Sequence, residues 1–552
     1  MRALRTGLLI AAVTLSTGFA SSVAAPEPST LVGTPATEDR IATATAEMRY
    51  CARQGPKRPG SEANRQLGRH IADRFRAAGL KTHMEPFRMP SFRVRTQRIE
   101  ITSPVQRRVP GESFMYAGSG VVHAPVVYVG HGRESDYLGV DARDKIVMVD
   151  NASGFHRTAQ LREIHEHGGA AMLYVSASPD NLVQTGTVAF AQDFRAPIPA
   201  VTVGSRDGDR LKELVSAERP LKMRLAVDAV RRDVVARNVI GVRRGTTYPN
   251  RYIVVGGHYD TWHAGSVDNC SSMGSMLQII EQTRRLRPAY TVIFAAWDAE
   301  EAGLVGSYDW VRRHQKLMPR VVMNENLEMT SAASYIGGNR LDHSLVNLMF
   351  GTLSPGMHTL VYQAAARNAF TPAPTTAEGV RAISGNIVPT DLQPFYTQGV
   401  QGFSTYSSTP YYHTREESPD KIDDASHLRV TDYLRDVLVD AQQLSPEAFA
   451  GREVPVVKVR APRTSRPGSG YPITVVVTDP EGRPVDGVPV RVLVNQRDHW
   501  AVAAGRARPL GEGRYRFRLR NGRTNSDLTH ITATVNTDLY GAEGYARVDQ
   551  RR

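Results

Sequence analysis

The sequence predicts an α/β protein with a mixed, mostly parallel sheet covered by helices. Between residues 253 and 444, near-continuous apolar runs alternate with segments of helical periodicity, a pattern typical of strands buried on both faces of a sheet. Short β-branched runs between residues 118 and 230, and another set of short strands in the last hundred residues, indicate two accessory modules. The chain has 552 residues, more than one hydrophobic core supports, which agrees with several domains.

The composition excludes several classes of protein. Hydrophobic residues make up 41% and charged residues 22%, which excludes a largely disordered chain and a multi-span membrane protein. The net charge of +13 would suit a polyanionic partner. However, the basic residues are scattered, with no block of five or six, so a general arginine bias explains the charge better than nucleic-acid binding.

The first residues have the pattern of an export signal. Arg2 and Arg5 precede an apolar stretch at 8–20 that is too short to cross a bilayer, and small residues follow at 22–25. We therefore expect a signal peptide at 1–25, a linker at 26–37, and a secreted protein without a transmembrane segment.

The secondary structure is predicted in chain order. Residues 38–90 are expected to be helical in large part, because Leu67, Ile71 and Phe75 share one helix face and Gly79 supplies a stop. The module at 118–230 is expected to be a small α/β domain, with strands at 126–129, 145–149 and 200–203 and a helix at 156–167. In the main region, strands at 253–255, 292–296 and 321–327 alternate with helices at 271–286, 307–314 and 425–444.

The C-terminal module is predicted to be a β-sandwich of immunoglobulin-like type at 460–552. Short strands at 473–477, 489–494, 513–519 and 530–535 are separated by Gly- and Pro-containing turns. Residues 460–470 are expected to form the linker that leads into it.

Acids and histidines follow the predicted strands of the main region. The residues that follow a strand or lie in the next loop are His258, Asp260, Asp268, Asp298, Glu300, Glu301, Glu325, Glu328 and His413. Ligands of open α/β sheets bind outside the carboxyl ends of the strands, so we expect these side chains to converge on one crevice.

These residue types suit zinc, which prefers nitrogen and oxygen ligands. Two zinc ions that share one carboxylate would activate a bridging water, and a second carboxylate would then take its proton. The pair Glu300 and Glu301 suits this division, since neighbouring side chains in extended backbone point apart. Asp260 could hold the imidazole of His258 as a hydrogen-bond acceptor.

Several motifs resemble the secreted di-zinc exopeptidases of the leucine aminopeptidase and glutamate carboxypeptidase type. They are GGHYDTW at 256–262, DN at 268–269, WDAEEAGLVGS at 297–307, PTDLQPF at 389–395 and YHT at 412–414. The resemblance covers residues 40–445 and implies a zinc exopeptidase fold at 38–117 and 231–450. The segment 118–230, with DKIV at 144–147 and GGA at 168–170, resembles the protease-associated domain often inserted in that family.

The resemblance also implies a role for each site residue. Asp268 would bridge two zinc ions, with His258 and Glu328 completing one zinc site and Glu301 and His413 the other. Glu300 would be the general base and then the acid that protonates the leaving amine. Tyr412 would donate to the developing oxyanion, or would simply pack in the core.

The sequence departs from the family pattern at three places. Glu328 stands where the family usually has Asp, so Glu325 competes with it as the fifth ligand. Cys270 follows the Asp-Asn pair, where it could ligate a metal or be a small buried residue; with Cys51 it could form one disulfide, and free buried thiols fit as well. His263 is expected to face the loop or the substrate instead of a metal.

The resemblance implies a secreted zinc exopeptidase that hydrolyses terminal peptide bonds of a peptide substrate. Aminopeptidase activity is favoured, since it is the commoner activity among secreted bacterial relatives. The alternatives are a carboxypeptidase or dipeptidase, an amidase or cyclase on the same scaffold, and a non-catalytic peptidase-like binding protein. The C-terminal sandwich could contact a cell surface or polysaccharide, or merely stabilise the protein.

Overall fold

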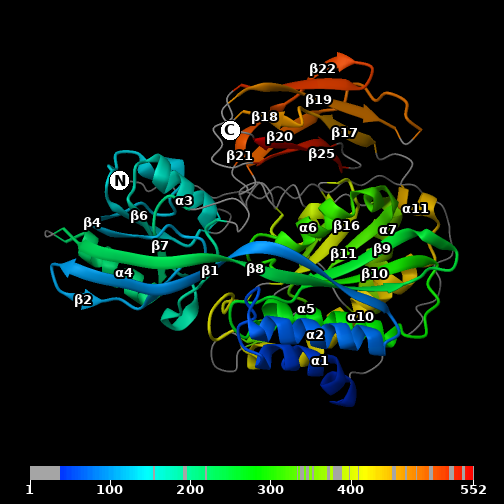
Figure 1. Ribbon diagram of the computed structural model, residues 1–552, viewed down its shortest axis with the longest axis horizontal. Coiled ribbons are helices and arrows are strands. Elements are labelled where there is room, and N and C mark those ends of the chain that lie inside the picture. Colours follow the sequence, from blue (N-terminus) through cyan, green and yellow to red (C-terminus); the bar gives the residue numbers. More distant parts are fainter. Residues whose placement is uncertain are drawn as a thin grey trace, which may run out of the picture. The chain divides into compact units, whose positions relative to one another are not determined.

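The computed structural model describes residues 38–152, 156–189, 196–217, 220–331, 334–335, 341–342, 347–350, 354–369, 373–376, 388–396, 398–407, 409–450, 455–466, 469–479, 481–496, 501–520, 528–536 and 541–550 (Figure 1). The predicted signal peptide at 1–25 and linker at 26–37 lie outside these residues and stay predictions. Among the described helices, none combines the length and the apolar character needed to cross a bilayer.

Four parallel strands form the centre of the main sheet. In spatial order they are β16 (Gly402–Tyr406), β11 (Val321–Asn326), β9 (Tyr248–His258) and β10 (Tyr290–Trp297). β14 (Asn347–Phe350) adds antiparallel to β16, and β15 (Ala373–Thr376) runs parallel to β14. The predicted mixed, mostly parallel sheet is therefore present in the described residues.

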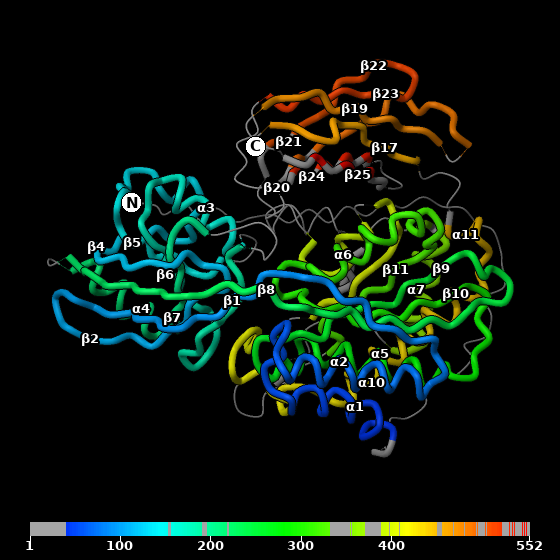
Figure 2. The backbone as a smooth tube through the Cα atoms, in the orientation of Figure 1, coloured from blue at the N-terminus to red at the C-terminus, as the bar shows by residue number. Residues whose placement is uncertain are grey.

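Helices cover both faces of this sheet (Figure 2). One face packs against α1 (Glu38–Arg53), α2 (Glu62–Ala77), α5 (Ser271–Gln282), α7 (Pro355–Arg367) and α10 (Asp424–Ala441). The other packs against α6 (Val305–Arg313) and α9 (Leu392–Tyr396). The strands alternate accordingly: Ile253 and Val255 lie in the first core, whereas Val254 lies in the second with Trp310 and Phe395. Short elements complete the region: β12 (Ser334–Tyr335), β13 (Leu341–Asp342) and α11 (Pro446–Ala450).

A long two-stranded ribbon joins the main sheet to the inserted module. β1 (Lys81–Ser103) pairs antiparallel with β8 (Lys222–Arg243) from Lys81–Val242 to Ser103–Lys222. One end of β8 also pairs with β10, and its other end pairs with β4. The expected helix up to residue 90 is therefore wrong beyond α2. β1 is an edge strand there, where Pro86 and Pro90 are tolerated because their missing amide donors leave no sheet partner unsatisfied.

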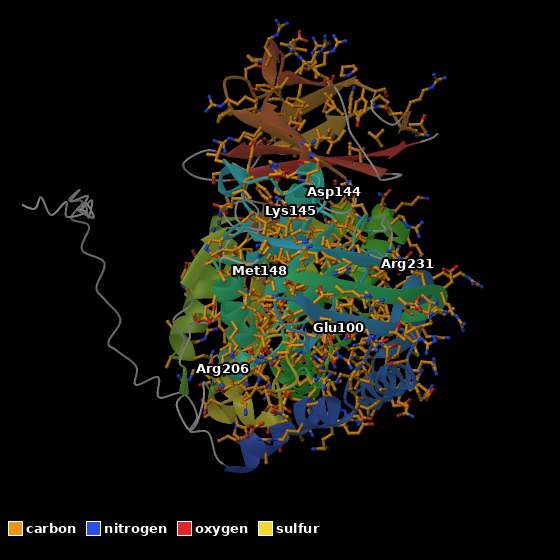
Figure 3. All side chains as sticks on the ribbon, turned by 90° about the vertical axis from the view of Figure 1, so that its left-hand side faces the viewer. Glu100, Asp144, Lys145, Met148, Arg206 and Arg231 are labelled. Carbon is orange, nitrogen blue, oxygen red and sulfur yellow. A yellow bond between two sulfur atoms is a disulfide. The ribbon has the colours of Figure 1, made fainter. Side chains whose placement is uncertain are left out.

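The inserted module has its own parallel strands. They are β4 (Gly120–Tyr128), β5 (Ile146–Asp150), β6 (Ala171–Val175) and β7 (Ala200–Val203), with β3 (Gly111–Ser113) antiparallel at the edge and β2 (Arg107–Arg108) on β1. α3 (Arg157–Glu166) and α4 (Ser205–Val215) cover opposite faces. Figure 3 views this part, with Met148 of β5 and Glu100 of β1 labelled. Because β8 passes residue 230 without a break, the domain boundaries at 118 and 230 stay predictions.

The C-terminal module consists of two sheets around one core. The first contains β17 (Val456–Arg460), β19 (Tyr471–Thr478), β23 (Arg514–Leu519) and β22 (Arg508–Gly511). The second contains β18 (Thr464–Ser465), β25 (Gly541–Gln550), β24 (Leu528–Asn536), β20 (Val490–Gln496) and β21 (Ala501–Arg506). The linker expected at 460–470 is wrong in part: β17 and β18 belong to the sheets, because β17 alternates its side chains and pairs with β19.

Candidate metal centre

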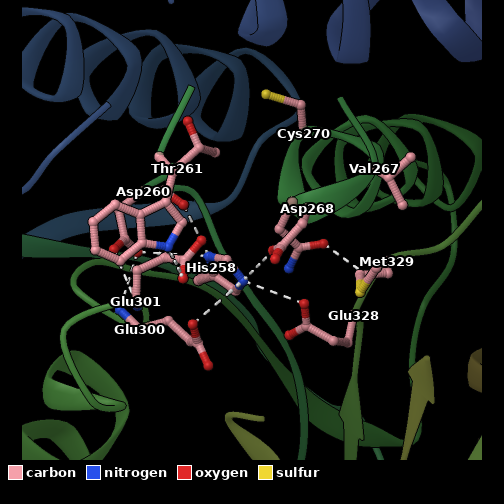
Figure 4. Close-up of polar contacts among 12 residues, drawn as sticks. His258, Asp260, Thr261, Val267, Asp268, Cys270, Glu300, Glu301, Glu328 and Met329 are labelled. Atoms are coloured by element: carbon pink, nitrogen blue, oxygen red, sulfur yellow. Dashed lines mark hydrogen bonds and ion pairs between the residues drawn. The ribbon is translucent and has the colours of Figure 1, made fainter. Parts of the chain in front are cut away.

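The carboxyl ends of the parallel strands bring several acids together around His258 (Figure 4). His258 is the last residue of β9, and Glu300 and Glu301 follow the end of β10. Glu328 lies two residues past β11, while Asp268 lies in the turn before α5. His413 comes from the loop after β16 and completes the cluster.

Two groups of three side chains share one aspartate. His258 Nε2 lies 3.2 Å from Asp268 Oδ1 and 3.3 Å from Glu328 Oε1. His413 Nε2 lies 2.9 Å from Asp268 Oδ2 and 3.2 Å from Glu301 Oε2. Within each group, one ligand atom from each residue lies within 4.8 Å of the others. All five residues expected as ligands are thus brought together, with Asp268 between the two groups.

The cluster lacks the positive charge that its burial requires. Asp268 Oδ1, Glu301 Oε1 and Glu328 Oε2 are buried without a hydrogen-bond donor among the described residues. Burial raises the pKa of Glu328 to about 8, opposed by the charge of His258. Burial lowers the pKa of His413, but Glu301 and Asp268 outweigh it and raise the value to about 9. Without a metal ion, the histidines and carboxyl groups of the cluster therefore bind protons. Divalent cations fit the site in place of these protons, because the donors are nitrogen and oxygen atoms.

Glu300 lies at the edge of the cluster and belongs to neither group. Its Oε2 is 3.7 Å from His258 Nε2, and its side chain is 14% exposed while those of the five ligand candidates are 8% or less. Burial raises its pKa well above the ordinary value, with the charge of His258 opposing and that of Glu328 adding. A raised pKa suits a group that must both accept and return a proton.

Asp260 contacts both the imidazole of His258 and the backbone amides of the two glutamates. Its carbonyl oxygen is 3.0 Å from His258 Nδ1, whereas its carboxylate oxygen is 3.6 Å away. The carboxylate accepts hydrogen bonds from the backbone amides of Glu300 at 3.0 Å and Glu301 at 3.2 Å. Asp260 therefore orients the histidine and also fixes the turn that carries the two glutamates.

Glu417 is a site residue that the sequence analysis did not find. Its Oε1 accepts from the backbone amide of Asp268 at 2.6 Å, and its Oε2 accepts from that of His413 at 2.9 Å. Its carbonyl also accepts from the amide of Ser266. One buried carboxylate thus braces a residue of each group. The only sequence signal was an acid four residues after His413, which looks like an exposed charge in the run at 415–417.

Cys51 and Lys57 fix the loop that carries Asp268. Cys51 and Cys270 form a disulfide, with a Cα–Cα distance of 5.6 Å. This excludes Cys270 as a metal ligand and decides the question of free thiols. The buried ammonium of Lys57 donates to the carbonyls of Cys51, Gly55 and Ala264, and burial lowers its pKa to about 7. These contacts fix the loop ahead of Asp268.

The remaining candidates lie around the cluster. The ring of Tyr412 stacks on His413 with centroids 3.7 Å apart, and the inserted module reaches the same loop through the amide of Thr185, which donates to the carbonyl of His413. Trp262 Nε1 donates to Glu301 Oε2 at 2.5 Å. His263 belongs to neither group, and burial lowers its pKa to about 4.

Glu325 points away from the metal centre. Its neighbour at i−2, Met323, lies in the core beneath α10, and the charge of Glu325 acts on Tyr433 of that helix. Burial raises its pKa well above the ordinary value. Glu328, with Oε1 at 3.3 Å from His258 Nε2, is therefore the better placed of the two competing candidates, and its role as the fifth ligand stays a prediction.

The fold and the cluster define a class: an α/β protein with two adjacent candidate metal sites that share one aspartate. Residues 238–438 match the family described as "Peptidase family M28". The resemblance to the di-zinc exopeptidases is thereby confirmed for this region, whereas the protease-associated domain at 118–230 stays a prediction.

Similar proteins support the same family. The Glutamate carboxypeptidase 2 homolog of Caenorhabditis elegans is 25% identical over 381 residues, covering 50% of this chain and 49% of the relative. Aminopeptidase NAALADL1 of Rattus norvegicus is 36% identical over 100 residues, 17% of this chain and 13% of that protein. The chain spans about half the length of the carboxypeptidase-type relatives it matches.

Solved structures share the fold. An aminopeptidase from Aneurinibacillus sp. strain AM-1 has a TM-score of 0.56 at 20% identity, covering 73% of this chain and 93% of that one. BSAP, a zinc aminopeptidase from Bacillus subtilis, has a TM-score of 0.55 at 20% identity, covering 73% and 94%. The predicted α/β fold with a mostly parallel sheet is therefore confirmed, whereas the protease-associated and immunoglobulin-like types of the two accessory modules stay predictions.

Proposed function

We propose that the chain is a secreted aminopeptidase with two zinc ions per molecule. The observation that carries the proposal is the pair of buried His-carboxylate groups joined by Asp268, with Glu300 beside them and outside both. His258, Asp268 and Glu328 would hold one ion, and Asp268, Glu301 and His413 the other. The export signal at 1–25 supports secretion.

The residues divide the chemistry of peptide hydrolysis among them. Bound zinc supplies a polarised carbonyl and a water of lowered pKa. Glu300 takes the proton of the attacking water on its carboxylate and returns it to the leaving amine. Asp260 keeps Glu300 and Glu301 in place through their amides, and the hydroxyl of Tyr412 donates to the oxygen on which negative charge develops.

An excess of carboxylates favours a substrate with a free amine. Asp391 is buried at the same site: its charge acts on Glu300 and Glu328, its Oδ1 accepts from Ser307, and its Oδ2 has no donor among the described residues. Together with Asp260, Glu300 and the three ligand carboxylates, it gives the site six carboxyl groups for two divalent ions, so the site would be anionic when all six are ionised. A cationic α-amine suits this field better than a carboxylate does. Carboxypeptidase activity is the second candidate, because several relatives bear that name.

The test measures the zinc content of the protein and its hydrolysis of three substrates. The wild type is expected to bind two zinc ions and to hydrolyse an aminoacyl amide, but not the N-acetylated form. Glu300→Gln should retain both ions and lose about 10²- to 10⁴-fold in kcat. Hydrolysis of the N-acetylated peptide with a free C-terminus would instead establish the carboxypeptidase. Full zinc loading without hydrolysis of any terminal bond would leave a peptidase-like binding protein.

A further inference from the structure

One sheet of the C-terminal module carries a dense set of cations on its outward side. In β17, β19 and β23 the inward residues belong to the core, and the outward ones are exposed or half-buried. β22 forms the edge of this sheet, and its Arg508 is exposed. We call six of the outward residues the basic face: Lys458, Arg460, Arg508, Arg514, Arg516 and Arg518, all of them exposed. Figure 3 shows nitrogen-tipped side chains projecting from the orange strands of this module.

Strand pairing arranges these cations in two dimensions. Arg460 pairs with Thr474, which pairs with Arg516, which in turn pairs with Arg508, so three arginines line up across the four strands. A second row contains Lys458 and Arg514 on either side of Val476. With strands about 4.8 Å apart and roughly 3.3 Å per residue, the face spans about 14 Å in one direction and about 13 Å in the other.

No acidic residue neutralises this array from within the sheet. The four strands contain no Asp or Glu at all. In the described part of the chain, Arg514 is paired with Glu512 of the adjoining turn at 3.1 Å, while the other five cations have no carboxylate partner. Six like charges gathered on one face repel one another, and an anionic partner would relieve that repulsion.

We propose that the basic face docks the protein on an anionic phospholipid bilayer. The two-dimensional spread matches a planar charged surface, whereas a linear polyanion needs a single track or groove. The outward positions of these strands carry no aromatic side chain on which nucleic-acid bases could stack. The outward apolar residues of β17, β19 and β23 are proline and valine, which are too short to insert, and Leu510 of β22 is half-buried. The contact is therefore electrostatic and rests on headgroup phosphates bound by the cationic side chains.

The experiment measures partition of the full chain onto vesicles of phosphatidylglycerol and phosphatidylcholine at equal ratio. Vesicles of phosphatidylcholine alone account for any binding through the apolar stretch at 8–20. The wild type should prefer the anionic vesicles and be released by salt. The triple variant Arg514→Gln, Arg516→Gln, Arg518→Gln should bind about 100-fold more weakly, since each basic residue near such a surface contributes about fivefold.

A matched control removes the same charge elsewhere. Arg284, Arg285 and Arg287 are exposed in the turn after α5, and changing all three to Gln should leave vesicle binding unchanged. Thermal unfolding and peptide hydrolysis by both triple variants report whether each remains folded. Equal loss in the control, wild-type binding by the first variant, or binding to heparin or duplex DNA without binding to vesicles would each overturn the proposal.

Discussion

The metal centre and the basic face gather charge in opposite ways. At the metal centre, acids from distant segments meet at buried strand ends, and backbone amides or side chains hold each one in a fixed place. On the basic face, cations from neighbouring strands are exposed to solvent, and among the described residues only Arg514 has a carboxylate partner. Charges held in low dielectric interact strongly and depend on one another, whereas exposed charges act weakly and independently. A single substitution should therefore affect several residues at the metal centre but only its own contact on the basic face.

Asp268→Asn should have the largest effect, because both groups use this carboxylate. The variant should bind zinc more than about 100-fold more weakly at both sites, beyond the range for residues that only support a ligand, whereas Glu328→Gln should weaken one site and spare the other. Zinc per chain in competition with a graded chelator measures both affinities. Loss of a single ion in Asp268→Asn would mean that the two groups are independent and that no carboxylate bridges them.

His427 tests whether burial dominates away from the metal centre as well. Burial in α10 lowers its pKa from 6.5 to about 4. The unfolded chain therefore binds a proton that the folded chain does not, and stability falls as the pH drops from about 6.5 towards 4, by about 3 kcal/mol over the whole window.

Replacement should abolish this dependence. In His427→Gln, the free energy of unfolding, measured by denaturant titration, should fall by about 3 kcal/mol less than in the wild type between pH 6.5 and 4. This holds even if the variant is less stable at pH 7. His123→Gln, at an exposed position, is the control and should follow the wild type. Parallel curves for wild type and His427→Gln would show that the imidazole is charged in the folded protein.

Glu417→Gln should weaken zinc binding about 10- to 100-fold at both sites, although Glu417 is not a ligand. The amide group can accept from only one of the two backbone donors, so Asp268 or His413 loses its brace. Glu416→Gln, the exposed neighbour, is the matched control. The readout is again chelator competition, since a merely destabilising change would lower the unfolding temperature without altering zinc affinity in the folded state. Unchanged affinity would reduce Glu417 to a structural residue.

The convergence of the candidate ligands could be predicted from the sequence because parallel strands end at one edge of a sheet. A residue such as His258 or Glu301 is recognised by following an apolar run. Glu417 and Lys57 were not predictable, because they act on backbone groups that sequence does not display. The ribbon of β1 and β8 was missed because Pro86 interrupts the strand pattern at a position where an edge tolerates it.

The basic face escaped prediction for a different reason. Along the chain, Arg514, Arg516 and Arg518 alternate with apolar residues, and Lys458 lies more than fifty positions earlier. A search for consecutive charged residues therefore finds only a scattered excess of basic residues. Strand alternation turns every second residue outward, and pairing of β17, β19 and β23 then sums the charges on one side. Charge density in β modules follows from register, which the linear sequence does not specify.

Arg516→Gln should have the smallest effect and sharpens the contrast between the two regions most directly. Arg516 lies at the middle of the row formed with Arg460 and Arg508. On a planar charged surface each cation contributes separately, so the variant should lose only about fivefold in partition onto phosphatidylglycerol vesicles, and Arg516→Lys should lose almost nothing. The single losses at 514, 516 and 518 should then multiply to the loss of the triple variant. If Arg516→Gln alone removed all binding, the face would be a specific pocket for one anion, with charges as interdependent as those around Asp268.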